Sequence, residues 1–259
     1  SGMLVDHDLR VLSPRQDFRF TAKTFWFGDI GLIYLSYDTH VQISPAPLEG
    51  FVLAQIPLAG TSTLKIGSQS IESSPLQATL PPQDQPSIMQ WYPKAPHLCV
   101  YVKQERLEEM ARQVYGLGEV ENLKLRPTLD LQTNQGKRFK QAILDFHQDV
   151  HEIELPRMAK LTEEVLIGRL LAASRNSVND ALDSWSSKAA LAVPKKRNLA
   201  KDFEQLVQKH FAEDVSVADF AERLNVSIRA LQLAVSDEFS STPSGLLIDE
   251  RLNQARKKL

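Results

Sequence analysis

The hydrophobic pattern of this chain changes its period once, close to Gln104. Ahead of that residue, short apolar runs alternate with polar residues as in half-buried strands, and the last of these runs covers 98–102. Clusters of Gly, Pro, Ser and Asp separate the runs, which is typical of an antiparallel sandwich or barrel. Behind Gln104, apolar residues recur at helical spacing, beginning with 107–114. We therefore expect strands over about 15–103 and helices over about 104–183.

Composition narrows the classes of protein that remain. The chain has 259 residues, 42% of them hydrophobic and 24% charged, which suffices to bury a core in one or two soluble domains. The single cysteine, Cys99, excludes an internal disulfide framework and fits a reducing cytoplasm. No apolar run is long enough to span a bilayer, and no leader sequence opens the chain. We expect a cytoplasmic protein without a membrane segment, and we interpret Ser1-Gly2 as the remnant of a cleaved tag.

Helices are expected behind the strands, followed by a polar stretch that divides the chain. The helices cover 104–116, 134–152 and 159–175. Residues 184–197 are expected to form a linker, because a Ser-, Asn- and Asp-rich stretch leads into them and a basic cluster ends them. That cluster, Lys195-Lys196-Arg197, is equally consistent with contact to phosphate and with a solvated linker. The predicted domains are therefore 1–183 and 198–259.

The segment 198–259 carries start signals for several short helices. Ser216 stands three residues before Asp219, close to a capping box, and opens a short helix. Asn225 is a residue type that tolerates the left-handed backbone conformation of a turn, and Ser227 is expected to cap the next helix. Pro243 is favoured at the first position of a further helix. A short helix, a tight turn and a second capped helix have the spacing of a helix-turn-helix.

In a helix-turn-helix, the second helix presents polar side chains to the major groove of DNA. On the helix that Ser227 opens, Leu231 and Val235 are expected to face the core. Arg229 offers paired hydrogen bonds to guanine, and Gln232 offers them to adenine. The residues expected on the DNA-facing side are Ser227, Ile228, Arg229, Gln232, Leu233 and Ser236.

The run Val217–Gln232 closely resembles the first helix-turn-helix of the AraC/XylS family, and the similarity continues through 241–244 and Arg251–Arg256. The front domain resembles the cupin-like sensor of XylS-type members. The residues that carry this second resemblance are Pro57-Leu58-Ala59-Gly60, Leu64, Gly67, Pro75, Ala78-Thr79-Leu80 and Pro81-Pro82.

The resemblance implies an α+β protein. Its N-terminal part would be a cupin-like antiparallel β-barrel with trailing helices, followed by an all-α helix-turn-helix domain. The partners implied are operator DNA, a small-molecule effector such as an aromatic acid, and a second copy of the chain. The homodimer would form through the helices after the barrel.

This sequence departs from the family pattern at several positions. Leu233 stands where members usually have Arg, Val235 where they have Phe, and Ser240 where they have Gly. Leu233 therefore removes one expected DNA contact. The family carries two helix-turn-helix units, and the second is absent from this sequence, so we expect a chain shortened by design or by processing. Because each lost phosphate contact lowers affinity steeply, we expect the chain to bind DNA weakly or not at all by itself.

Aromatic and polar residues of the strand region are candidates for a ligand pocket, since such pockets are mostly apolar with a few polar groups. The candidates are Trp26, Tyr34, Gln55, Met89, Trp91 and Tyr92. The alternative for each of them is an ordinary place in the core or on the surface. Neighbouring strand residues point to opposite faces, so Trp91 and Tyr92 cannot both point inward.

Metal sites are not expected. The strand region offers only His40 and His97, without the clustered His and Glu ligands of a cupin metal site, and we interpret both as ordinary surface or loop histidines. His147 and His151 share a predicted helix face, but no Glu follows the first as in a zinc-protease motif. We interpret that face as solvated. No catalytic residue and no cofactor are predicted.

Three functional hypotheses follow from the sequence. The first is a ligand-responsive DNA-binding transcription regulator that senses a small molecule through its N-terminal domain. The second is a small-molecule-binding or dimerisation module with impaired DNA binding, which Leu233 and the absent second helix-turn-helix favour. The third is a cupin enzyme, which the lack of metal ligands disfavours.

Overall fold

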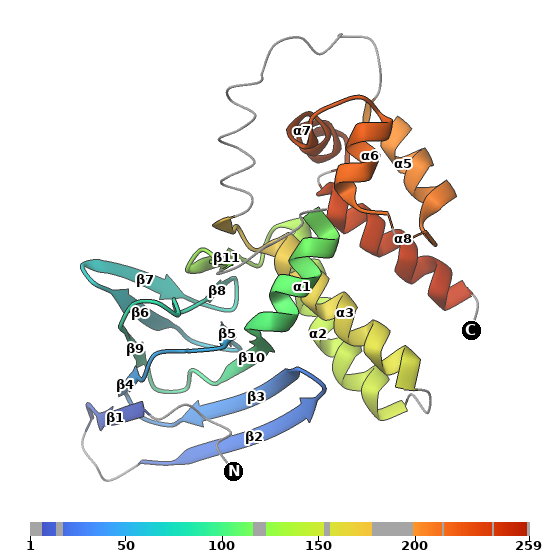
Figure 1. The fold of residues 1–259 in the computed structure, drawn as a ribbon. Helices are drawn as coiled ribbons and strands as arrows, with labels where there is room; N and C mark the ends of the chain where they lie inside the picture. Colours follow the sequence, from blue (N-terminus) through green and yellow to red (C-terminus); the bar gives the residue numbers. More distant parts are fainter. Residues whose placement is uncertain are drawn as a thin grey trace. The chain divides into compact units, whose positions relative to one another are not determined.

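The computed structural model of the chain runs from strands into helices, in the order that the two hydrophobic periods predict (Figure 1). The chain forms two compact units. The β unit contains the described parts of 1–106 and 124–136, and the helical unit those of 107–123 and 137–259. The described residues are 7–13, 18–115, 123–152, 156–177, 199–213, 215–239 and 241–257. The predicted linker 184–197, with Lys195-Lys196-Arg197, lies outside them.

Two antiparallel sheets make up the β unit. One sheet has the order β11-β8-β5-β10-β3-β2, with β2 (Phe20–Phe27), β3 (Ile30–Tyr37), β5 (Phe51–Pro57), β8 (Gln77–Thr79), β10 (His97–Lys103) and β11 (Thr128–Asp130). The other has the order β1-β4-β9-β6-β7, with β1 (His7–Val11), β4 (Val41–Pro45), β6 (Ser62–Ile66), β7 (Gln69–Ser73) and β9 (Ser87–Trp91). The antiparallel architecture is confirmed. The described strands form two sheets, and the barrel that the family resemblance implies is not closed among them.

Two strands lie where the sequence predicted none. β1 begins at His7, ahead of the predicted strand region, and pairs with β4 through Leu9 and Ile43. β11 lies within the region predicted as helical and pairs with β8 through Thr128 and Thr79. A strand of three residues is too short to show an alternating pattern, so β11 depends on its partner strand and not on local preference.

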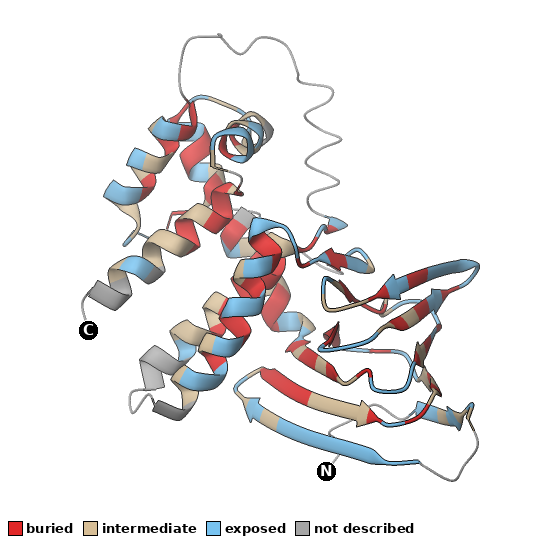
Figure 2. Ribbon diagram, turned by 180° about the vertical axis from the view of Figure 1, so that it is seen from behind, coloured by how far each residue is buried: buried red, intermediate tan, exposed pale blue. Residues whose placement is uncertain are grey.

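The two strands of the hairpin β2–β3 differ in how far they are buried. Figure 2 shows β2 exposed along most of its length, whereas β3 beside it is largely buried. β2 is an edge strand of its sheet, and β3 contributes to a hydrophobic cluster that draws on both sheets. The buried members of that cluster are Ile33, Tyr37, Val41, Ile43, Leu64, Ile66, Ile71, Met89, Trp91 and Cys99.

Seven helices follow β10 in the described part of the chain, with β11 between the first two of them. They are α1 (Gln104–Tyr115), α2 (Asn134–Glu152), α3 (Pro156–Ala173), α5 (Leu199–His210), α6 (Val217–Arg223), α7 (Ile228–Phe239) and α8 (Pro243–Lys257). The helices predicted over 104–116, 134–152 and 159–175 are confirmed as α1, α2 and α3, with small differences at their ends. No helix in the described ranges is long and apolar enough to cross a membrane.

The last four helices pack around their own cluster of buried side chains. Phe203 of α5 and Phe220 of α6 are fully buried and meet edge to face, with 5.5 Å between ring centroids. The helical unit also joins α8 to the earlier helices, because Asp249 pairs with Arg138 of α2 and Arg169 of α3. The structure therefore groups 198–259 with α2 and α3, and does not separate it as a compact unit of its own.

Candidate functional site

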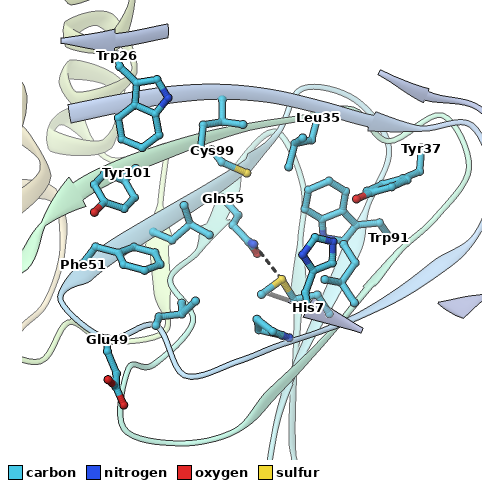
Figure 3. Close-up of a pocket in the computed structure, with 16 residues that line it drawn as sticks. His7, Trp26, Leu35, Tyr37, Glu49, Phe51, Gln55, Trp91, Cys99 and Tyr101 are labelled. Carbon is cyan, nitrogen blue, oxygen red and sulfur yellow. Dashed lines mark hydrogen bonds between the residues drawn. The ribbon is translucent and has the colours of Figure 1, made fainter. Parts of the chain in front are cut away.

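A cavity of about 340 Å³ in the β unit is lined by strands of both sheets (Figure 3). Lining residues on one strand are two positions apart, as expected for side chains on one face; β5 supplies Phe51, Leu53 and Gln55. The described lining consists of His7, Trp26, Ile33, Leu35, Tyr37, Ile43, Pro45, Leu48, Glu49, Phe51, Leu53, Gln55, Met89, Trp91, Cys99 and Tyr101. A mostly apolar cavity of this size suits a small organic molecule.

Three aromatic rings gather in one part of the cavity wall (Figure 3). Trp26 meets Tyr101 edge-on at 4.9 Å between ring centroids, and Phe51 stacks on Tyr101 at 4.6 Å. Gly31 makes room for the indole of Trp26, because a Cβ at that position would lie 2.7 Å from the ring. Flat apolar rings of this kind offer favourable stacking and edge contacts to a planar ligand.

A second aromatic group, built around Trp91, is anchored in the core. Trp91 is 2% exposed, meets Tyr37 edge-on at 5.6 Å, and stacks on His97 at 3.7 Å. The Nδ1 of His97 donates to the carbonyl oxygen of Ala95 at 2.8 Å, and the hydroxyl of Ser62 donates to Nε2 at 2.8 Å. Burial lowers the pKa of His97 to about 4, so the ring is neutral near pH 7.

His97 corrects an expectation from the sequence. It was predicted to be an ordinary surface or loop histidine, but it is fully buried in β10. The reason is that His97 has a partner for each ring nitrogen and a stacked indole, which together make a buried neutral imidazole acceptable. His97 is therefore a structural support of Trp91, one of the cavity-lining residues.

Gln55 is the buried amide of the cavity. It is 3% exposed, and its Nε2 donates to the sulfur of Met89 at 2.9 Å, which is the dashed line in Figure 3. Its Oε1 accepts a long hydrogen bond of 3.5 Å from the hydroxyl of Thr79. A thioether is a weak acceptor, so the amide N–H of Gln55 retains capacity for a better partner.

The cavity disfavours negative charge on its own side chains. Burial raises the pKa of the Cys99 thiol to about 12. Burial, and secondarily the neighbouring Cys99, raise the pKa of the Tyr37 hydroxyl to about 12. Both groups therefore stay protonated across the physiological range, and neither supplies an activated nucleophile.

The six pocket candidates from the sequence divide into two groups. Trp26, Gln55, Met89 and Trp91 line the cavity, although their binding of a ligand stays a prediction. Tyr34 is half-buried on β3, between Ile33 and Leu35, which do line it. Tyr92, the residue after β9, does not line the cavity either. It is 36% exposed, and its ring centroid lies 4.8 Å from that of His40.

Several cavity residues were not predicted from the sequence, notably Tyr37, Phe51 and Tyr101. A usable signal was present, because a period of two counted back from Gln55 reaches Leu53 and Phe51 on the same face. Nothing local indicated which face of β10 would carry Tyr101 inward, since that depends on the pairing of β10 with β3 and β5.

The histidines considered as metal ligands do not come together in the described structure. Among the described residues, no group of three or more His, Cys, Asp or Glu side chains is placed to hold an ion. His40 is half-buried beside Tyr92. Of the pair on α2, the side chain of His151 lies outside the described residues, so the pair with His147 stays a hypothesis.

The second candidate site is the pair of helices α6 and α7. The expected capping box is present: the amide of Asp219 donates to Ser216 Oγ at 3.2 Å, and the amide of Ser216 donates to the Asp219 carboxylate at 2.8 Å. The turn is also as predicted, with Asn225 at a φ of 55°. Ser227 Oγ accepts from the amide of Ala230 at 3.1 Å and begins α7.

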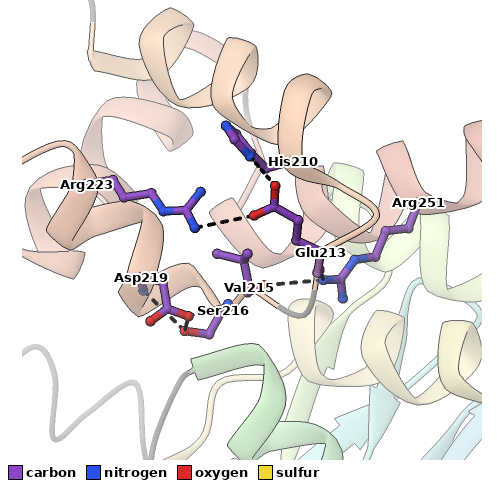
Figure 4. A network of polar contacts seen from close by, with 7 residues as sticks. All are labelled: His210, Glu213, Val215, Ser216, Asp219, Arg223 and Arg251. Carbon is purple, nitrogen blue, oxygen red and sulfur yellow. Dashed lines mark hydrogen bonds and ion pairs between the residues drawn. The ribbon is translucent and has the colours of Figure 1, made fainter.

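A polar network holds the segment that precedes α6 (Figure 4). Arg251 of α8 donates to the carbonyl oxygens of Phe211, Glu213 and Val215, at 3.0, 3.0 and 3.3 Å. The Glu213 carboxylate contacts His210 at 2.6 Å and Arg223 at 3.4 Å, and these partners, His210 first, lower its pKa. Arg251 thus acts as a brace between α8 and the start of the helix pair.

The predicted DNA-facing residues do not all share one environment. Ser227 and Ser236 are exposed, Gln232 is half-buried, and Leu233 is 48% exposed. Ile228 corrects the expected division of α7, because it packs against the buried cluster of the last four helices. The side chain of Arg229 lies outside the described residues, so its expected contact with guanine stays a prediction.

A family model, a relative and two solved structures match this chain. A family model described as an AraC-binding-like domain matches residues 1–172. The "Probable thc operon regulatory protein" of Rhodococcus erythropolis is 26% identical over 270 residues, covering 100% of this chain and 78% of that protein. The AraC-like transcriptional activator CuxR is similar with a TM-score of 0.47 at 12% identity, covering 96% of this chain and 86% of that one. A Cupin_2 domain of an XRE-family regulator from Enterobacter cloacae has a TM-score of 0.28 at 13% identity, covering 32% and 95%.

Proposed function

Because this chain belongs to the AraC family of regulators, through an AraC-binding-like domain that spans residues 1–172, we propose that it is a ligand-responsive DNA-binding transcription regulator. The observation that carries the proposal is that one chain holds both a cavity of about 340 Å³ and a capped helix pair with a polar outer face. A cavity of that kind suits a small-molecule effector, and a helix such as α7 suits the major groove.

DNA reading is assigned to α7. Leu231 and Val235 are fully buried and fix one face of the helix, which leaves Gln232, Leu233 and Ser236 on the other. The amide of Gln232 has the donor and acceptor that adenine pairs with, and Ser236 can contact a base or a phosphate. Ser227, at the start of α7, and Arg229 complete the proposed contact set.

Effector sensing is assigned to the cavity. A ligand alters a second site only by binding two states of the protein with different affinity. The proposal is therefore that the occupied and empty cavity favour different arrangements of α6–α8 or of a homodimer formed through α1, α2 and α3. Leu144 of α2 is 62% exposed, and among the described side chains of these helices it is the large hydrophobic residue that a dimer interface would bury.

In vitro selection tests the DNA-binding part of the proposal. The purified 259-residue chain is mixed at low salt with duplexes carrying a randomised segment, because one helix pair makes few phosphate contacts and binds weakly. We expect an enriched sequence motif, with Gln232→Ala relaxing the preference at one base position by about 1–3 kcal/mol. Gln205→Ala, an exposed glutamine on α5, is the matched control and should leave the motif unchanged.

The second candidate function is a small-molecule-binding or dimerisation module with impaired DNA binding. It is favoured by Leu233, an exposed apolar side chain at a position where a cationic one would contact DNA. The selection experiment separates the two functions. A motif that depends on Gln232 supports the regulator, whereas unselective recovery of duplexes by both the native chain and the Gln232→Ala variant supports the module.

A further inference from the structure

The described cavity wall offers a ligand almost no charge. Among the described lining residues there is no Lys and no Arg, and the ionisable groups at its margin, His7 and Glu49, are both exposed. Charges in contact with water are screened and stabilise a buried ion little. A carboxylate placed at the buried end of the cavity, beside Gln55, would therefore lose hydration without gaining a buried cationic partner, which is an unfavourable exchange.

The wall does offer neutral hydrogen-bond donors. The Nε2 of Gln55 is spent on the thioether of Met89, a weak acceptor. The indole N–H of Trp91 is buried and has no acceptor within the described part of the chain. Protein atoms cover the indole nitrogen of Trp91. Buried donors normally have good partners, so the amide of Gln55, which lines the cavity, marks the place where an acceptor atom of a ligand would be most favourable.

The side chains of the wall respond to the same environment. Burial keeps the Cys99 thiol and the Tyr37 hydroxyl protonated, with the pKa of each raised to about 12. The desolvation that suppresses these two anions would act on a ligand carboxylate as well. An uncharged acceptor such as a carbonyl oxygen avoids that penalty and still accepts a hydrogen bond from the amide of Gln55.

We propose that the cavity binds a neutral, largely planar molecule with an aromatic or similar apolar body and one carbonyl-type acceptor, and that it discriminates against carboxylates. The proposal rests on the assignment of the cavity as the effector site, and it replaces the aromatic acid that the family resemblance implies. In it, Gln55 is the residue that recognises the acceptor, and the rings of Trp26, Phe51 and Tyr101 contact the apolar body.

Isosteric pairs of probes test the discrimination directly. Benzamide and 2-naphthamide are titrated against the full chain at pH 7, in parallel with benzoate and 2-naphthoate, by calorimetry and by tryptophan fluorescence, to which Trp26 and Trp91 of the cavity wall contribute. We expect at least one amide to bind about tenfold or more tightly than its carboxylate partner. Gln55→Met, which keeps the side-chain volume and removes the amide, should weaken the better amide about tenfold.

Gln90→Met is the matched control, because Gln90 lies on β9 between two lining residues and does not itself line the cavity. It should leave amide binding unchanged. Equal or tighter binding of the carboxylates would overturn the proposal, as would failure of both amides to bind or insensitivity of their binding to Gln55→Met. These readouts do not involve DNA. A chain that binds the amides but selects no DNA motif would favour the module with impaired DNA binding and leave the ligand class standing.

Discussion

In the β unit the buried amide of Gln55 has weak partners, whereas in the helical unit Arg251 donates to three backbone carbonyl oxygens. The first arrangement keeps hydrogen-bonding capacity available inside an apolar cavity. The second uses that capacity to hold the segment ahead of α6. The comparison shows two uses of polar side chains: one leaves a site open to a ligand, and the other fixes a scaffold from which α7 is presented.

The last four helices should depend strongly on the buried pair Phe203 and Phe220. Phe220→Ala removes a fully buried ring that meets Phe203, so we expect a loss of about 3–5 kcal/mol in the free energy of unfolding. Hydrogen exchange measured on peptides from α5–α8 locates the loss. Leu233→Ala, on the exposed side of α7, is the control and should change stability little. A small effect of Phe220→Ala would show that this cluster does not hold the helix pair.

The β unit should be the acid-sensitive region, because of His97. Its pKa in the folded chain is about 4, below the ordinary value of about 6.5, so the unfolded chain takes up the proton first as pH falls. The contribution of neutral His97 to the free energy of unfolding is fully present above about pH 6.5 and is lost progressively as the pH falls to about 4. The loss approaches roughly 3 kcal/mol at most, since one pKa unit corresponds to about 1.4 kcal/mol.

Urea unfolding between pH 7.5 and pH 4.5, followed by tryptophan fluorescence, measures this loss. His97→Phe keeps a ring against Trp91 and has no proton to bind, so its stability should vary much less over that range. An unchanged pH dependence in the variant would mean that other groups are responsible.

Arg251 should matter more than Arg223, although both are arginines near the same loop. Arg251→Met removes three hydrogen bonds to carbonyl oxygens and should cost about 2 kcal/mol. Arg223→Met breaks a solvent-exposed ion pair with Glu213 and should be near neutral. Thermal unfolding of the two variants side by side makes the comparison, and equal effects would contradict the role of Arg251 as a brace.

The smallest loss of stability is expected from the capping box of α6. Ser216→Ala leaves the amide of Asp219 without its side-chain acceptor and should cost about 1 kcal/mol. Ser236→Ala, in the exposed middle of α7, should cause no loss because no cap depends on it. Chemical unfolding of both variants tests this, and a loss in Ser236→Ala as large as that in Ser216→Ala would argue against capping as the cause.

The predictability of the two sites differs for a physical reason. Ser216, Asn225 and Ser227 form caps and a turn within a few residues, so local rules sufficed to predict the start of α6 and α7. Ile228 was assigned to the wrong face, because the first turn of a helix can reach a core that its spacing alone does not reveal. Helix periodicity also sufficed for α1, α2 and α3.

The cavity was only partly predictable, because its lining depends on which strands pair. Tyr34 is a residue type common in ligand pockets, yet its neighbours Ile33 and Leu35 line the cavity and Tyr34 does not. A shift of one residue in the register of a strand moves all its side chains to the opposite face of the sheet. For β3 that register is set by its partner strands β2 and β10. For the same reason β11 was not predicted, and the described strands form two sheets where a barrel was expected.

The central claim is that an effector in the cavity alters DNA binding by the helices. The most direct measurement is the Kd of a selected duplex, by fluorescence anisotropy, without and with a saturating amide probe. We predict a change of about fivefold or more in either direction for the native chain, and a markedly smaller change for Gln55→Met at the same probe concentration. An identical Kd with and without a probe that demonstrably occupies the cavity would contradict the account.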